Sequence, residues 1–158
     1  MTAPTPSQTV GPFFGFALPF DGAADAADGD AGDAIRVAGQ VLDGAAEPVP
    51  DALVEASAGE QFARCRTDHE GAFHLTLRKP VVSVGAPCFE ITVFARGLLR
   101  HLHTRLYLPD EEAANRADRV LQLVDEARRR TLVSRQDGDV VRFDIRLQGE
   151  GETVFFAL

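Results

Sequence analysis

The sequence predicts an all-β protein, an antiparallel β-sandwich with an extended N-terminal arm and one short helical segment. From Ile35 onward apolar and polar residues mostly alternate, which is typical of strands that bury one face. Turn signals built from Gly, Pro and Asp separate these runs, as in a sandwich of many short strands. The length of 158 residues is usual for one domain. We therefore expect a single domain over 1–158, with an arm and a mobile loop at 1–34 and the sandwich at 35–158.

Residues 1–20 form the predicted arm because prolines and phenylalanines crowd this stretch. Proline restricts the backbone and lacks an amide hydrogen, which favours an extended, irregular path over a helix. The four phenylalanines of the arm are expected to lie across a surface of this chain or of a partner. Residues 21–33 contain only Asp, Ala and Gly, a composition that buries too little apolar area to order itself. A mobile loop is therefore predicted there.

Turn residues divide the sandwich region into short strands and one helical stretch. Asp43-Gly44 closes the first strand, and Asp137-Gly138 predicts a later hairpin turn. Asp110 opens the helical stretch, which reaches about Val124, and Glu111 and Glu112 are favourable in its first turn. Leu121 and Val124 are expected to pack inward. Strands are expected at 35–42, 52–56, 62–66, 72–77, 89–95, 99–108, 132–134, 140–147 and 153–156.

Charge and composition exclude several classes of function. The chain has 16 basic and 24 acidic residues, a net charge of −8 that repels nucleic-acid phosphates unless a local basic face exists. No apolar run approaches the roughly 18 residues of a membrane helix, and residues 1–8 lack the features of a secretory signal. Cys65 and Cys88 form no disulfide framework and are expected to be reduced thiols. A cytoplasmic protein without nucleic-acid or membrane partners is the expectation.

A histidine pair is the first candidate for metal chemistry. His101 and His103 are two residues apart on a predicted strand and share a face with Arg105 and Tyr107. A His-x-His pair is a common fragment of a metal site. No third ligand is evident, so an amphipathic strand with a polar outer face is the favoured interpretation. Tyr107 is the only tyrosine, so two phenolate ligands cannot come from this chain alone.

Arg96 is the other residue that indicates chemistry. It ends an apolar strand, where its guanidinium can reach out of the sandwich rim and bind a carboxylate in a paired hydrogen bond. An ion pair with one of the many acidic side chains of the chain itself is equally compatible with the sequence. Motifs for a serine nucleophile or a phosphate-binding loop are absent from the sequence, and Cys88 is expected to be a small buried residue.

Four segments together resemble one family. They are TPSQTVGPFF at 5–14, VFARG at 93–97, HLHTRLY at 101–107 and RFDIRLQGEGETVFF at 142–156. These segments are similar to the alpha subunits of protocatechuate 3,4-dioxygenases, within the intradiol ring-cleaving dioxygenase family. The resemblance runs nearly end to end. It implies an intradiol dioxygenase-like sandwich that pairs with a homologous iron-binding beta subunit, the pairs forming a larger hetero-oligomer.

The resemblance also implies that this chain holds no metal. In the family, the beta subunit binds Fe(III) through two tyrosines and two histidines. Cys88 and Glu90 occupy the positions that match the histidine ligands, and Val81-Val82-Ser83 follows Lys79-Pro80 where a ligand tyrosine is expected. His101 and His103 fall on the next strand. Ferric iron prefers hard anionic phenolates, which this chain lacks, so the Fe(III) cofactor is expected on the partner.

By the same resemblance, Thr9, Gly11 and Pro12 match arm positions that line the substrate pocket, and Arg96 matches an arginine close to it. The positive charge of Arg96 favours the substrate carboxylate or charge that develops on the opened ring. The implied reaction cleaves protocatechuate with O2 to 3-carboxy-cis,cis-muconate, a step of aromatic catabolism through the beta-ketoadipate route. We expect no catalytic residue within this chain alone and no activity without the partner.

Two alternatives and one departure from the family accompany this hypothesis. The first alternative is that the chain is a stand-alone β-sandwich binding module without catalytic activity, although such a module is not expected to expose the phenylalanines of the arm. A further alternative is an independent metalloenzyme that uses His101 and His103. The stretch 53–71 looks shorter than in the family, which affects the expected contact between subunits.

Overall fold

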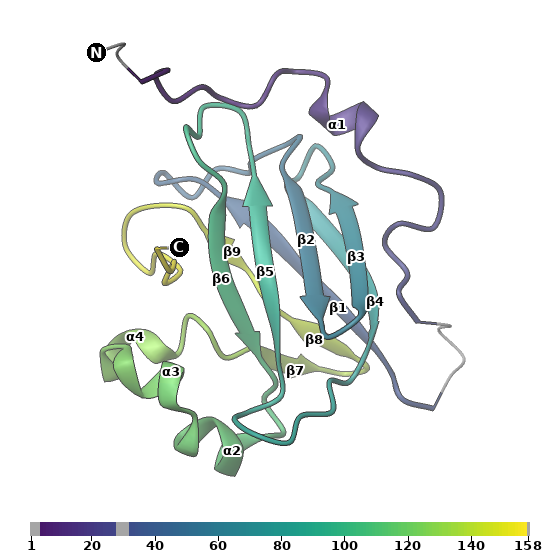
Figure 1. The fold of residues 1–158 in the computed structure, drawn as a ribbon, viewed down its shortest axis with the longest axis vertical. Helices are drawn as coiled ribbons and strands as arrows, with labels where there is room; N and C mark the ends of the chain where they lie inside the picture. The colour runs from purple at the N-terminus through teal and green to yellow at the C-terminus, as the bar shows by residue number, and fades with distance from the viewer. Residues whose placement is uncertain (1–3, 28–31, 158) are drawn as a thin grey trace.

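Two β-sheets pack face to face in the computed structural model, which describes residues 4–27 and 32–157 (Figure 1). One sheet has the order β4-β1-β8-β7, with β9 beside β1, and the other has the order β3-β2-β5-β6. The prediction of a β-sandwich is therefore confirmed. The strands are β1 (Ala34–Leu42), β2 (Leu53–Ala58), β3 (Gln61–Arg66), β4 (Ala72–Arg78), β5 (Cys88–Phe94), β6 (Leu102–Tyr107), β7 (Arg135–Asp137), β8 (Val140–Arg142) and β9 (Ile145–Arg146).

The sequence predicted a purely antiparallel sandwich, but the structure contains both antiparallel and parallel strand pairs. β1 pairs with β4 in the antiparallel sense but with β8 and β9 in the parallel sense, Val37 opposite Val141 and Val41 opposite Ile145. The chain visits the second sheet and the helices before it returns to β1, and such a long crossover permits parallel pairing. The predicted strand 140–147 is split into β8 and β9, and the hairpin turn at Asp137-Gly138 is confirmed between β7 and β8.

The last part of the chain contains fewer strands than predicted. Val133 forms an isolated bridge with Tyr107 rather than a strand, and the Phe156 amide donates to the carbonyl of His103 at 2.8 Å. The predicted strands 132–134 and 153–156 are therefore reduced to a few backbone hydrogen bonds with β6 and β9. Each contact satisfies a backbone group at the outer edge of the sheet, but a ladder does not form.

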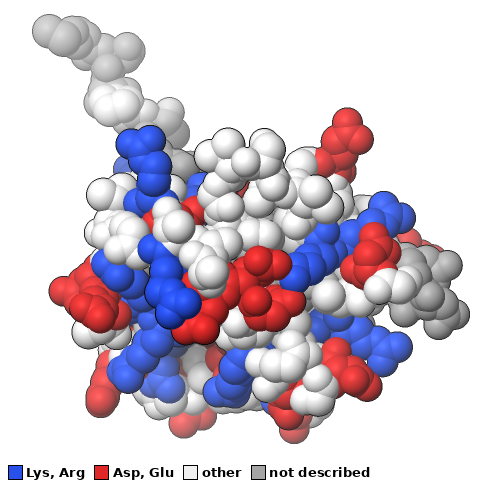
Figure 2. All heavy atoms as spheres, turned by 90° about the horizontal axis from the view of Figure 1, so that it is seen from below, with Lys and Arg blue, Asp and Glu red and all other residues white. Residues whose placement is uncertain are grey.

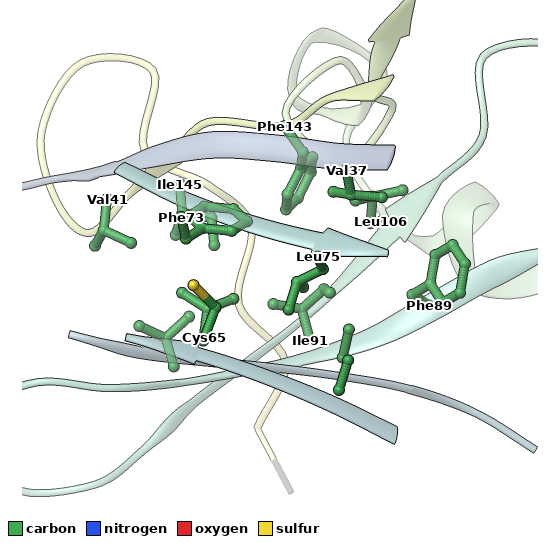
Figure 3. Close-up of a cluster of buried hydrophobic side chains, with 14 of the residues drawn as sticks. Val37, Val41, Cys65, Phe73, Leu75, Phe89, Ile91, Leu106, Phe143 and Ile145 are labelled. Atoms are coloured by element: carbon green, nitrogen blue, oxygen red, sulfur yellow. The ribbon is translucent and has the colours of Figure 1, made fainter. Parts of the chain in front are cut away.

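The core lies between the two sheets (Figure 3). Alternate side chains of β1 and β4 meet those of β2, β3 and β5, which follows from the period-two pattern of the sequence. Cys65 points into this core, and its burial raises the pKa of the thiol. Cys65 and Cys88 are both free thiols. Close packing of Val37, Phe73, Leu75 and other residues therefore fixes how the sheets and their ends lie relative to each other.

Three short helices replace the single helix predicted at 110–124. They are α2 (Glu112–Ala117), α3 (Arg119–Leu123) and α4 (Glu126–Arg129). Asp118 and Asp125 interrupt the helix because each adopts an extended backbone, and its carboxylate caps the helix that follows. Leu121 is buried against Tyr107 and Leu132, as the sequence predicted. None of the described helices has the length and apolar character that crossing a membrane requires.

The arm contains one helical turn, α1 (Phe14–Ala17), where the sequence predicted only an irregular path. The stretch between Pro12 and Pro19 is free of proline, so the backbone can form i→i+4 bonds there, and burial of Phe14 stabilises the turn. Figure 1 shows the arm crossing one end of the sandwich.

Residues 23–27 lie against the edges of β3 and β4, which differs from the mobile loop predicted for 21–33. The amide of Arg64 donates to the carbonyl of Ala23, and Thr76 pairs with the backbone of Ala24 and Ala26. Edge strands offer unpaired backbone groups, which fix even an Asp-Ala-Gly segment that buries little apolar area. Residues 28–31 lie outside the described residues. The division into 1–34 and 35–158 stays a prediction.

A substitution at Gly39 tests how tightly β1 packs against the backbone at Phe143. A Cβ built at Gly39 would lie 1.8 Å from the carbonyl oxygen of Phe143, whereas one at Gly44 would meet only ordinary contacts from 3.5 Å. We expect Gly39→Ala to lower the free energy of unfolding by about 3 kcal/mol or more, because the backbone of 143 must move. Gly44→Ala should change it by less than about 0.5 kcal/mol. Urea denaturation measures both, and equal losses would contradict this packing.

Candidate functional site

The two ends of the sandwich carry different sets of polar residues (Figure 1). We call the end with the arm, Asp51 and the β5–β6 connection at 95–101 the arm end. The helical end carries the β4–β5 connection at 79–87 and lies next to α2. The strands run the length of the molecule between the two ends, so a residue at one end does not reach the other.

All four predicted pocket residues lie at the arm end. Thr9, Gly11 and Pro12 are exposed, and the neighbouring Gln8 and Val10 line a cleft of about 200 Å³ together with the end of β5 and the β5–β6 connection. Arg96 lies in the same connection and is also exposed. The structure thus brings the arm and Arg96 to one end of the sandwich, although they are far apart in the sequence.

Arg96 forms an ion pair within the chain, one of the two interactions compatible with the sequence. Its Nη2 lies 3.1 Å from Oδ2 of Asp51, and its side chain is still 58% exposed. Asp51 also accepts a hydrogen bond from Arg66, which holds the pKa of the carboxyl below its usual value despite the opposing effect of desolvation. Much of the Arg96 side chain therefore remains accessible to a ligand beside the ion pair.

Asp51 and Arg66 also belong to the candidate site, although the sequence alone did not predict them as site residues. The register of the second sheet brings them together, because Leu53 of β2 lies opposite both Arg66 of β3 and Phe94 of β5. Residues just beyond this row therefore meet at the arm end. No local motif in the sequence predicts that Asp51, Arg66 and Arg96 lie close together, because whole strands separate them along the chain.

At the helical end, a cleft of about 510 Å³ is lined by Cys88 and Glu90, the two residues that the resemblance predicts to match the histidine ligands of the family. Glu90 is fully engaged there, with Oε2 2.7 Å from Nε2 of His103 and Oε1 2.8 Å from Nη2 of Arg105. Burial raises the pKa of Cys88 to about 11, so its thiol is neutral near pH 7. These side chains are held in hydrogen bonds or in the uncharged form.

Tyr107 is not available as a phenolate. The side chain is buried, its hydroxyl donates to Oδ1 of Asp118 at 2.9 Å, and burial raises the pKa of the phenol well above its usual value. Asp118 in turn accepts bonds from the amides of Ala86, Val120 and Leu121. This network fastens the β4–β5 connection and α3 to β6.

The donors of the chain do not fit a ferric ion. Within residues 4–27 and 32–157, no three His, Cys, Asp or Glu side chains gather as a metal site would require. His101 lies one residue before β6 and packs against the ring of Phe94 at 5.5 Å, whereas His103 is bound to Glu90. The two histidines therefore have separate structural partners rather than a common ligand.

Known proteins with similar sequences decide the family. The chain is 39% identical to a protocatechuate 3,4-dioxygenase alpha chain from Burkholderia cepacia over 189 aligned positions, with 96% of each chain covered. It is 38% identical to the alpha chain from Pseudomonas putida, with 96% of this chain and 95% of that chain covered. The chain belongs to the protocatechuate 3,4-dioxygenase alpha-chain family. No family model matches the sequence.

Solved structures agree with this alpha-chain assignment at the level of fold. The dioxygenase domain of a dioxygenase–carbohydrate-binding fusion from Streptomyces sp. SirexAA-E superimposes with a TM-score of 0.65 at 23% identity, over 93% of this chain and 99% of that one. Catechol 1,2-dioxygenase from Pseudomonas arvilla C-1 gives 0.57 at 19% identity, over 79% of this chain and 55% of that one. The fold of the alpha chain is therefore that of the intradiol dioxygenases.

The alpha chains from Burkholderia cepacia and Pseudomonas putida contain residues without a counterpart here. The alignments extend over 189 and 191 positions, more than the 158 residues of this chain. Only Gly59 and Glu60 separate β2 from β3, and Gly59 provides the positive φ of this turn. The tight hairpin is compatible with a shortening at 53–71, whose location stays a prediction.

The Asp118 network predicts a pH-dependent loss of stability. Burial alone would raise the pKa of Asp118, but bonds from Leu121, Ala86, Tyr107 and Val120 outweigh it and hold the pKa below its usual value. The carboxylate therefore stabilises the fold above about pH 4, and this contribution is lost as the pH falls through the lowered pKa.

We expect Asp118→Ala to lower the unfolding free energy by about 2 kcal/mol at pH 7. The difference from wild type should narrow on acidification, as measured by urea denaturation between pH 7 and pH 3. Asp125→Ala is the control, because the exposed Asp125 caps α4 through the amide of Ala127 alone. A difference for Asp118→Ala that stays constant with pH would contradict the role of its charge.

Proposed function

We propose that the chain is the non-iron-binding alpha subunit of a protocatechuate 3,4-dioxygenase and completes an active site with a homologous beta subunit. The observation that carries this proposal is the similarity to alpha chains over 96% of the sequence. The complex cleaves protocatechuate with O2 between its two hydroxyl-bearing carbons and yields 3-carboxy-cis,cis-muconate. The Fe(III) belongs to the beta subunit, and no step of the reaction is assigned to a metal on this chain.

The separation of the two ends supports a site shared between subunits. The arm crosses the arm end (Figure 1), where the β5–β6 connection carries Arg96, whereas Cys88 lines the cleft at the helical end. The arm of this chain therefore does not line the cleft of its own helical end. Residues of the arm contribute to chemistry only if a second chain brings its own reacting centre to the arm end.

The contribution of this chain is to bind and orient the substrate. Arg96 presents an exposed guanidinium, which suits the carboxylate of protocatechuate. No atom lies within 4 Å of a Cβ built at Gly11, so the backbone there is open to close approach by a ligand. Pro12 fixes the path of the arm beside it. Thr9 adds a hydroxyl on the same exposed stretch.

Exposed aromatic side chains on the arm support a partner subunit and disfavour a stand-alone binding module. Phe13, Phe16 and Phe20 are 73%, 66% and 62% exposed. Large apolar side chains grouped on one segment usually mark a contact surface. The separate partners of His101 and His103 disfavour the independent metalloenzyme in the same way.

The charge distribution supports the expectation that nucleic acids are not partners. Acidic and basic side chains are interspersed on the face seen from below (Figure 2). A broad basic surface, which a nucleic-acid backbone requires, is not present on that face. A cytoplasmic location stays a prediction.

The first test separates the proposed subunit from a self-sufficient enzyme. The chain purified alone is expected to contain no stoichiometric iron and to be inactive, because its donors do not fit the ion. Co-expression with a homologous beta chain should yield a complex with iron, visible tyrosinate–iron absorption and ring-cleaving activity. Metal analysis and oxygen uptake measure both states. Full activity of the chain alone would overturn the proposal.

The second test concerns Arg96. In the complex, Arg96→Ala should lower kcat/KM for protocatechuate about tenfold, the scale of one charged hydrogen bond, while the iron content stays unchanged. Arg116→Ala is the matched control, since Arg116 is an exposed arginine of α2 near the other end of the sandwich. Loss of iron in Arg96→Ala would show that Arg96 is not placed against the substrate.

A further inference from the structure

Asp51 connects two arginines at the arm end through different oxygens. Its Oδ1 accepts a hydrogen bond from Nη2 of Arg66, and its Oδ2 accepts one from Nη2 of Arg96 at 3.1 Å. The Asp51 side chain is only 30% exposed, whereas that of Arg96 is 58% exposed. A half-buried carboxylate is thus the fixed member of the pair, and the exposed guanidinium takes its direction from it.

Arg66 continues this connection to the arm. Its guanidinium lies over the ring of Phe16 at 5.2 Å from the centroid, and a Cβ at the buried Gly15 would lie 3.2 Å from its Nε. The side chain of Arg66 therefore packs directly on α1. A second arginine of β3 assists, since Nη1 of Arg64 donates to the carbonyl of Leu18 just after α1 at 2.8 Å.

We propose that Asp51 is a positioning residue, which holds Arg96 and the arm helix α1 in a fixed relation through its two carboxylate oxygens. This inference rests on the proposed function for the role of Arg96 and deepens it. A free arginine side chain populates many rotamers, and restricting it before the ligand arrives lowers the entropic cost of binding a carboxylate. The same carboxylate keeps Arg66 on the arm, so both contributions of the chain to the shared pocket depend on one side chain.

Asp51→Asn is the suitable variant because it preserves the backbone. Asp51 has a φ of 67°, a left-handed conformation that Asn tolerates and that Ala does not adopt readily. Asparagine keeps the shape of the side chain but has a single acceptor oxygen, and its amide group repels a guanidinium. The loss of the negative charge weakens the contacts with both arginines, so the variant holds neither Arg66 nor Arg96 as firmly as the wild type does.

The experiment compares protocatechuate with catechol, which has the same two hydroxyls and no carboxylate, in the complex with the beta subunit. Asp51→Asn should raise KM for protocatechuate about three- to fivefold, the upper range for one exposed ion pair, with kcat changed less than twofold. KM for catechol should rise less, because catechol has no carboxylate for Arg96 and is affected only through the arm. On the Arg96→Ala background, Asp51→Asn should raise KM for protocatechuate no more than it raises KM for catechol. An equal rise in KM for both substrates would overturn the positioning role, because general loosening of the structure does not distinguish a carboxylate.

A second measurement follows the arm without reference to activity. Chymotrypsin cleaves after the exposed Phe16 and Phe20, and cleavage of the full chain should be several-fold faster in Asp51→Asn, because Arg66 no longer stays on α1. Glu112→Gln is the control, since it breaks an exposed carboxylate–guanidinium pair with Arg116 on α2. Unchanged arm cleavage would overturn the proposal. If Arg96→Ala itself leaves KM for protocatechuate unchanged, the proposed function of Arg96 fails, and the cleavage rate alone decides whether Asp51 holds the arm.

Discussion

The mutual covering of two apolar sheet faces is the constraint on which the rest of this structure depends. Side chains such as Val37, Leu75 and Ile91 leave water only if β1 and β4 lie across β2 and β5. Strand ends are then fixed by the packing of the strand interiors. Charged residues such as Arg96 and Asp51 lie where the strands stop, so the packing of the core also determines their positions.

The polar side chains at the helical end bond to one another, which explains why this end has a structural role. Glu90 bonds His103 and Arg105, and Tyr107 bonds Asp118. Groups paired in this way in a half-buried setting are held in one direction, so they are poor candidates for coordinating an ion. The bonds of Asp118 with Tyr107, Ala86 and Leu121 instead attach α3 and the β4–β5 connection to β6.

The arm end has the opposite character. Its ion pairs are partly exposed, and isolated pairs of this kind add little to stability. The ion pairs instead determine how side chains are oriented, because Asp51 orients one guanidinium toward solvent and another toward the arm. Exposed phenylalanines lie on the arm next to this network. The proposed partner subunit would cover such a surface.

Local physical chemistry in the sequence determined most of the strands, the hairpin at Asp137-Gly138 and the inward position of Leu121, because alternation, turn propensity and amphipathicity depend on near neighbours alone. The resemblance of segments along the chain identified the family, whereas the pocket residues that it assigns to the arm stay a prediction. Tertiary structure alone decided the parallel pairing of β1, the break at Asp118 and the meeting of Asp51 with Arg66 and Arg96. These features depend on sheet register and on carboxylate partners far along the chain, and no local pattern of residues encodes such distances.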